Sequence, residues 1–345
     1  MIIDRRLTEW SRDLGLLGSF ASLKSSTARS GIRRYTYLTS LRQAEELWRS
    51  AKSSSMLTSP ILRYYALMQA GLAIASSCRL GNSDWQANAG HGLDLVAPQV
   101  AAGTVLDFNN VVIRSRGRHM AAQVLAEALE SPLLTGDVTL AQLIASLRDQ
   151  PIYHAGDSDI RLPLVINVYS GPASMSLDVM RGINVEKLGR DSAGQVPIQE
   201  LQDVFANYPS FRSIPLWQSA TVEQGWVFDC PDFVRLEYPL NQWFPWSQLD
   251  PYFDEWASDA HGGRGDPVSC VYPALGANTV AQHPLLTWYL CMYAFSILAR
   301  YHPASWRALL NKEETIVAGL LENLVQERSE DAFDLVGGVL QQIVS

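Results

Sequence analysis

Residues 60–78, PILRYYALMQAGLAIASSC, constrain the fold most strongly, because they form an almost uninterrupted apolar run. Proline suits the first turn of a helix, where a missing backbone N–H costs nothing. At helical spacing the run carries two stripes, a larger one of Ile61, Tyr65, Met68, Leu72 and Ala75 and a small-residue one of Ala66, Ala70, Ala73 and Ser77. A helix that is apolar on both sides is buried on both sides. The run therefore predicts a central core helix.

The polar, glycine-rich segment GNSDWQANAGHGL, residues 81–93, follows this helix and predicts a surface loop. Within it, His91 stands between Gly90 and Gly92. A histidine held on a glycine turn beside a buried helix is a candidate base or ligand. It is equally a loop histidine whose glycines only permit a tight backbone path. The residues leave both interpretations open.

The segments before and after this region are mainly helical. Residues 1–37 are expected to form an N-terminal arm, and SLRQAEELWRSAK predicts a helix capped by Ser40 with Gln43. VVIRSRG, from Val111, predicts a strand, and HMAAQVLAEALES predicts a helix after it. Thr139 and Gln142 form a second capping box.

The middle of the chain has a different character, since IRLPLVINVYSG and GWVFDCPDFVRLEYPL are rich in β-branched and aromatic residues. Helical patterns return at HPLLTWYLCMYAFSILARYHP and continue to the end. The sequence therefore predicts an α+β protein that is predominantly helical. We expect one domain over residues 38–345, helical at 38–150, β-containing at 151–245 and helical at 246–345.

Composition limits the partners and the compartment. The 345 residues are 47% hydrophobic and 18% charged, which is typical of a folded protein with a substantial core. A formal net charge of −8 argues against nucleic acid and anionic membranes, although it leaves open a local basic patch at Arg114, Arg116 and Arg118. The longest apolar stretch, 284–299, is shorter than the roughly 20 residues that a membrane span needs. Four separated cysteines and a charged N-terminus favour a cytoplasmic protein without a membrane anchor.

Standard catalytic signatures are missing from the sequence, including phosphate-binding loops, HExxH, GxSxG and CxxC. Arg114 and His119 satisfy the Arg-x4-His spacing of HEPN-type ribonucleases, in which both residues face one RNA phosphate. Here Arg114 ends a strand-like run and Gly117 interrupts the segment, whereas those motifs lie in or at a helix. The alternative to a nuclease site is therefore a chance match.

Two later segments also offer candidates. Trp243, Trp246 and Trp256, among further aromatic residues, could stack a base or sugar, receive a partner or fill a core. The loop SDAHGGRGDP holds His261 between Asp259 and Asp266, a set that could bind a metal but that is more typical of a polar loop between elements. We expect no metal and no cofactor, and we take His261 as a binding candidate.

The order of several segments resembles the YaaC-like family of bacterial proteins. The resemblance begins with SLRQAEELWRSAKSSSMLTSPILRYYALMQAGLA, continues through GHGL, VVIRSRGRHMAAQVL and VTLAQLIASL, and ends with HPLLTWYLCMYAFSILARYHPASW. It implies a cytoplasmic bacterial protein and carries no known activity. The GHGL turn is the most site-like feature that the resemblance covers, which makes His91 the best single candidate.

Two functions follow as expectations. The first is a non-catalytic binding or scaffold subunit of a bacterial multi-protein system, with a protein partner or a second copy of itself. The alternative is a nuclease-like or hydrolytic effector, for example in phage defence, that uses Arg114, His119 and His91.

Overall fold

In the computed structural model the chain forms two compact units, one of Met1–Ile144 with His283–Ser345 and one of Ala145–Gln282. The predicted division into an N-terminal arm and a single domain stays a prediction. The structure describes residues 31–78, 80, 84–87, 90–99, 104–147, 161–170, 175–181, 203, 206–208, 217–222, 225–230, 268–311, 315 and 317–344.

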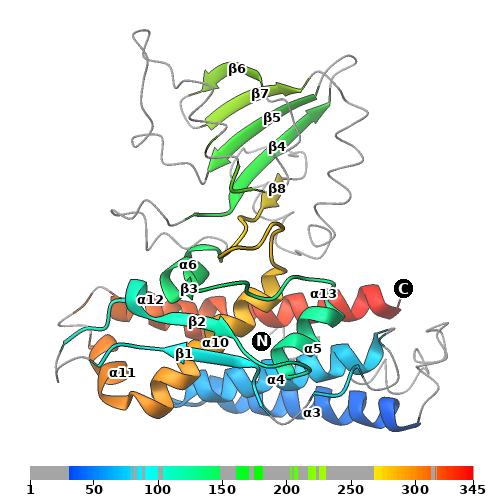
Figure 1. Cartoon of the computed structure of the whole chain (residues 1–345), viewed down its shortest axis with the longest axis vertical. Coiled ribbons are helices and arrows are strands. Elements are labelled where there is room, and N and C mark those ends of the chain that lie inside the picture. The colour runs from blue at the N-terminus through cyan, green and yellow to red at the C-terminus, as the bar shows by residue number, and fades with distance from the viewer. Residues whose placement is uncertain are drawn as a thin grey trace. The chain divides into compact units, whose positions relative to one another are not determined.

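The first unit is mainly helical and draws its helices from both ends of the chain (Figure 1). Its longer helices are α3 (Gly31–Lys52), α4 (Ser59–Ser77), α10 (Pro284–Tyr301) and α13 (Glu330–Val344). Its shorter elements are η2 (Phe108–Asn110), α5 (Ala121–Ala128), α6 (Leu140–Ala145), α11 (Pro303–Leu309), α12 (Val317–Glu322) and the π-helix η7 (Asn323–Arg328).

Helix α4 is central in this unit, because α3, α5, α10 and α13 all pack against it. Its small-residue stripe is fully buried, so α3 comes close enough to run beside it (Figure 1). Its other stripe differs from the prediction, since Tyr65, Met68 and Leu72 are only half-buried. The helix is a core helix on one side and borders an opening on the other.

Helix α3 begins at Gly31, so the helix start predicted at Ser40 is wrong. Ser40 lies inside α3, where the buried stripe Tyr37, Leu41, Ala44 and Trp48 runs through it at helical spacing. This stripe extends the helix toward the N-terminus and outweighs a local capping signal.

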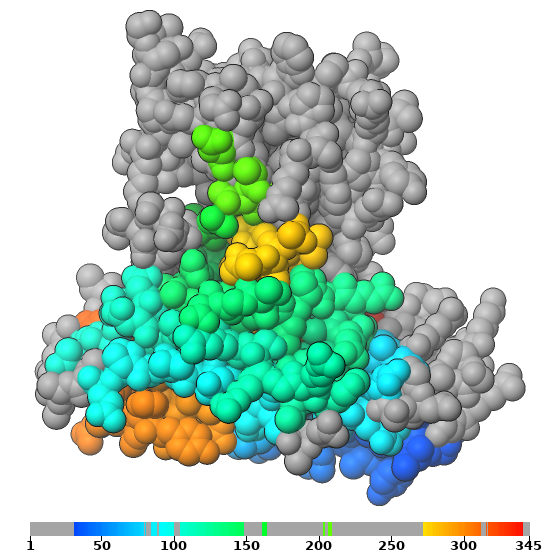
Figure 2. All heavy atoms as spheres, viewed as in Figure 1, coloured from blue at the N-terminus to red at the C-terminus, as the bar shows by residue number. Residues whose placement is uncertain are grey.

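A small antiparallel sheet, β1 (Leu93–Val96), β2 (Val112–Ser115) and β3 (Val138–Thr139), belongs to the same unit. The strand and helix predicted from Val111 onward are confirmed as β2 and α5. The second capping box is confirmed as well, because Thr139 N–H donates to Gln142 Oε1 at 3.0 Å and Gln142 N–H donates to Thr139 Oγ1 at 3.1 Å. Residues from β1 to α6, cyan to green, form much of the face of this unit in Figure 2.

Helix α10 is buried along most of its length, since 14 of its residues are buried and most of these are apolar. His283 precedes it, and its Nδ1 accepts the Leu285 N–H at 3.0 Å, which caps the first turn. Helix α13 is tied to α4 by the buried Arg63, whose guanidinium lies 3.5 Å from Glu330 Oε1 and 4.3 Å from the Trp48 ring. The two ends of the chain therefore share one core.

The second unit contains a five-stranded antiparallel sheet in the order β6-β7-β5-β4-β8. Its strands are β4 (Leu164–Ser170), β5 (Met175–Arg181), β6 (Trp217–Val222), β7 (Gly225–Cys230) and β8 (Val268–Val271). Strands β4 to β7 lie in the part of the chain predicted to be β-containing, 151–245, whereas β8 lies in the part predicted to be helical, because Val268–Val271 pairs with β4. The α+β, predominantly helical fold class is confirmed. In the described residues, no helix combines the length and the hydropathy that a bilayer crossing requires.

Candidate functional site

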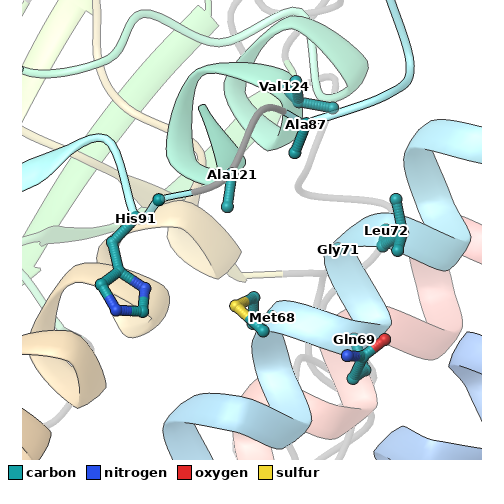
Figure 3. Close-up of a pocket in the computed structure, with 9 residues that line it drawn as sticks. Met68, Gln69, Gly71, Leu72, Ala87, His91, Ala121 and Val124 are labelled. Carbon is teal, nitrogen blue, oxygen red and sulfur yellow. The ribbon is translucent and has the colours of Figure 1, made fainter. Parts of the chain in front are cut away.

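A pocket of about 270 Å³ opens between α4 and α5 in the first unit (Figure 3). Most of its wall is apolar. Helix α4 contributes Met68, Gln69, Gly71 and Leu72, helix α5 contributes Ala121 and Val124, and the segment between α4 and β1 contributes Ala87, Gly90 and His91. In Figure 3, His91 lies at one end beside Met68, and Leu72 lies toward the other end. The half-buried stripe of α4 is therefore one wall of a pocket.

The Gly-His-Gly turn is shaped by its contact with the start of α5. The carbonyls of Gly90 and His91 accept the backbone N–H groups of Ala121 and Ala122, at 3.4 and 3.1 Å, and so cap a helix that has no side-chain cap. The backbone φ is +136° at Gly90 and +76° at Gly92, values that favour glycine. The glycines of the turn are explained by backbone geometry alone.

No side chain could replace the hydrogen at Gly92. A Cβ there would collide with the Gln123 amide and lie 2.6 Å from Met120 Cβ. The Gln123 amide donates to the carbonyls of Gly92 and Arg116, both at 3.1 Å, and so joins the turn to the end of β2. The turn, β2 and α5 thus hold one another at a fixed spacing beside the pocket.

The His91 side chain has a separate set of partners. Its Nδ1 shares a hydrogen bond of 2.7 Å with the Tyr64 hydroxyl, which in turn lies 3.2 Å from the Tyr289 hydroxyl. Tyr64 and Tyr289 are buried, whereas the imidazole is half-buried. The rings of Tyr65 and Tyr293 approach the imidazole at centroid distances of 6.3 and 5.8 Å. We call Tyr64, Tyr65, His91, Tyr289 and Tyr293 the tyrosine cluster.

Arg300, near the end of α10, borders the tyrosine cluster. Its Nη1 donates to the Tyr65 hydroxyl at 3.1 Å, and its Nε donates to the Ser296 carbonyl at 3.3 Å. The guanidinium carbon lies 5.6 Å from the Tyr65 ring centroid. It also lies 5.2 Å from the Tyr301 ring centroid, so one hydroxyl, one carbonyl and two aromatic rings surround the cation.

Burial and charge fix the protonation states at the site. Burial, with a further contribution from the Arg300 cation, lowers the pKa of His91 below its usual value. Burial raises the pKa of Tyr64 and of Tyr289, and raises the pKa of Tyr293 to about 12. At neutral pH the imidazole is therefore neutral and the three phenols are protonated. The site therefore offers uncharged hydrogen-bonding groups beside the pocket.

The structure places Arg114 and His119 on the surface of the first unit. Arg114 lies on β2, where its Nε and Nη2 donate to the two carboxylate oxygens of Asp137 at 2.6 and 2.7 Å. His119 is exposed and has a φ of +53°, in the turn that leads into α5. Arg114 is thus engaged by a carboxylate, and no described contact joins it to His119. The nuclease-like alternative stays a prediction.

The other predicted candidates cannot be placed. Trp243, Trp246, Trp256 and His261 lie outside the described residues, as do Asp259 and Asp266. Within the described ranges, no three His, Cys, Asp or Glu side chains gather in a way that could hold a metal ion.

Sequence reasoning missed most of the tyrosine cluster and Arg300. One signal was present, because Tyr64 and Tyr65 stand in an otherwise apolar helix and Tyr289 and Tyr293 are spaced i, i+4 in another. A buried phenol needs a hydrogen-bond partner, so hydroxyls in core helices indicate a shared polar site. The partners themselves lie far apart in the chain.

Fold and site together define a class: a mainly helical α+β protein with a small apolar pocket that ends at a tyrosine-bound histidine. The chain belongs to the YaaC-like family, because the family model described as YaaC-like Protein matches residues 19–338. Neither the curated proteins nor the solved structures contain a match to the chain.

Proposed function

We propose that this YaaC-like protein is a non-catalytic binding subunit that holds a small, mainly apolar group in the pocket between α4 and α5. The observation that carries this proposal is the pocket itself, about 270 Å³ in volume and lined mostly by apolar side chains. Ligand sites are commonly apolar concavities with a few well-placed polar groups. His91 is such a group, because Tyr64 fixes its ring.

The support extends to the way the pocket is built. The carbonyls of Gly90 and His91 hold the start of α5 against the turn, and α3 and α10 also pack against α4. The walls therefore belong to packed helices and exist before any ligand arrives. Preformed walls reduce the entropy that binding must overcome.

The wider setting is part of the same proposal. We place the protein in a cytoplasmic bacterial multi-protein system, where its partner is another protein or a second copy of this chain. The net charge of −8 and the YaaC-like family membership agree with this setting. Size-exclusion chromatography with light scattering on the intact protein tests for a second copy, and a pull-down from the native host tests for a protein partner. A strict monomer that captures no protein contradicts this part of the proposal.

A variant that fills the pocket tests the binding proposal. Ala121 is half-buried and lines the pocket, so Ala121→Leu adds bulk inside it without entering the core. Ala308→Leu is the matched control, because Ala308 is half-buried on α11 and does not line the pocket. A library of small apolar compounds is screened by ligand-observed NMR. Hits that bind the parent and Ala308→Leu, but not Ala121→Leu, support the proposal. Hits that bind all three equally, or a library without hits, overturn it.

A further inference from the structure

Tyr289, Tyr64 and His91 form a row of two hydrogen bonds, and all their buried hydrogens find acceptors only if the donors run from Tyr289 toward His91. Each phenol has a single hydrogen, and the Tyr64 hydroxyl lies between His91 Nδ1 and the Tyr289 hydroxyl. If Nδ1 carried the imidazole proton, it would donate to Tyr64, and Tyr64 would donate to Tyr289. The hydrogen of Tyr289 would then lack an acceptor among the described contacts, in a residue with 1% exposure. Buried hydroxyl hydrogens are almost always paired.

The opposite direction pairs every hydrogen in the chain. Tyr289 donates to Tyr64, and Tyr64 donates to Nδ1 of His91. Because the pKa of His91 is lowered and the ring is neutral, its one proton must then stand on Nε2. The half-buried imidazole thus presents an N–H donor on the side away from Tyr64.

Arg300 adds a positive charge on the same part of the cluster. Tyr65 joins the two residues, since its ring contacts His91 and its hydroxyl accepts from Arg300. Among the described residues, no carboxylate forms an ion pair with Arg300, and its buried Nη2 has no hydrogen-bond partner. Asp94, whose charge contributes to the raised pKa of Tyr293, pairs with Arg116, its Oδ2 lying 3.8 Å from Arg116 Nη1. An N–H donor therefore lines the pocket at His91, and a cation without its own anion lies behind it, close enough to lower the pKa of His91 although it does not line the pocket.

We infer that the ligand of this pocket is a small apolar carboxylate, whose anionic group accepts from His91 Nε2–H and is stabilised at longer range by the Arg300 cation. The inference rests on the proposed binding function and names the chemical class of its ligand. A carboxylate fits because one of its oxygens can accept the N–H of His91, while a nearby cation without an anion of its own favours a single negative charge. A phosphate dianion would need more donors than the pocket supplies. The apolar body of the ligand lies along Met68, Leu72 and Val124.

The test compares cyclohexanecarboxylate with cyclohexylmethanol, which share an apolar ring and differ in charge. Isothermal titration measures both ligands on the intact protein and on Arg300→Met, Arg300→Lys and the control Arg307→Met, which removes an exposed arginine. The parent is expected to bind the carboxylate about tenfold more tightly than the alcohol, as a charge-assisted hydrogen bond predicts. The preference disappears in Arg300→Met, persists in part in Arg300→Lys and is unchanged in Arg307→Met.

The outcomes separate this inference from the proposed function. Equal binding of both ligands, blocked by Ala121→Leu, leaves the binding function intact and overturns the carboxylate. Binding of neither ligand overturns the inference, while the compound library still decides the binding function. A preference that survives in a folded Arg300→Met protein removes Arg300 from the site. The imidazole ¹⁵N spectrum is an independent check, since a proton on Nδ1 of His91 contradicts the first step.

Discussion

At the scale of single residues, His91 and Tyr64 depend on one another. His91→Ala leaves the buried Tyr64 hydroxyl without its acceptor, and Tyr64→Phe leaves His91 Nδ1 without its donor and the Tyr289 hydroxyl without its acceptor. Each change is expected to cost about 1–3 kcal/mol of unfolding free energy, as orphaned buried polar groups do. The double variant should cost clearly less than the two costs added together.

Urea unfolding of the four proteins measures this double-mutant cycle. Strictly additive costs would show that the 2.7 Å contact carries no coupling. If His91 were a turn residue without partners, its replacement alone would change stability by no more than about 1 kcal/mol.

A second residue, His283, makes stability depend on pH. Burial lowers its pKa to about 3, because a proton on the ring would be desolvated and would abolish the Nδ1 acceptor that caps α10. The unfolded chain takes up this proton near pH 6.5, so stability is lost as pH falls from about 6.5 toward 3. The slope from this residue approaches about 1.4 kcal/mol per pH unit.

His283→Asn keeps a capping oxygen and removes the titration. Thermal melting of both proteins is measured between pH 4 and 8. Plotted against pH, the two melting temperatures should run parallel above pH 7 and diverge below pH 6, with the parent losing more stability. Parallel curves over the whole range would mean that His283 is not buried as described.

The sequence identified His91 as a candidate site residue. It did not identify the residues that contact His91, because they are far from one another in the sequence. Glycines on both sides of His91 made it visible as a candidate. Its partners were not visible, because Tyr64 meets Tyr289 across 225 positions of the chain. A pocket is a gap in packing, and hydrophobic periodicity reports only which side chains prefer burial, so Leu72 was expected in the core.

At the scale of elements, the glycine turn is expected to be intolerant of any side chain at position 92. Gly92→Ala combines a positive φ with a collision against Met120 and Gln123, so it should destabilise the protein by about 2–4 kcal/mol. Gly319→Ala is the matched control. Gly319 lies inside α12 with no atom within 4 Å of an added Cβ, so alanine should stabilise by about 0.5–1 kcal/mol.

Thermal unfolding of the two alanine variants measures both effects. Equal stabilities would refute the geometry of the turn. A Gly92→Ala protein that folds normally, yet keeps its ligand affinity, would show that the spacing of α5 does not shape the pocket.

Elements with long apolar stripes were predicted well, and their ends were not. Helices α4 and α10 and strand β2 were identified from local patterns. The start of α3 was missed because Ser40 offers a capping signal while Tyr37 extends the apolar stripe beyond it. The Thr139 and Gln142 cap was predicted correctly, since no apolar stripe competes with it there.

At the scale of the whole molecule, the first unit needs both ends of the chain. A chain that ends after Gln282 lacks α10 to α13 and leaves the buried side of α4 without its cover. We expect this truncated chain to lose the near-ultraviolet circular dichroism of buried residues such as Trp48 and to melt without cooperativity in this unit. Co-expression of residues 283–345 as a separate chain should restore both signals. A truncated chain with an intact spectrum would contradict the shared core.

The same chain order has a consequence for protein synthesis. Roughly 200 residues separate the end of α4 from the start of α10. At about 5–20 residues per second, the ribosome releases α4 roughly 10–40 s before the helix that covers it. During that interval α4, one of the most apolar segments of the nascent chain, remains partly exposed to water, where it can aggregate or bind chaperones. The yield of folded protein is therefore expected to depend on translation speed and chaperone supply more than on the final stability of the fold.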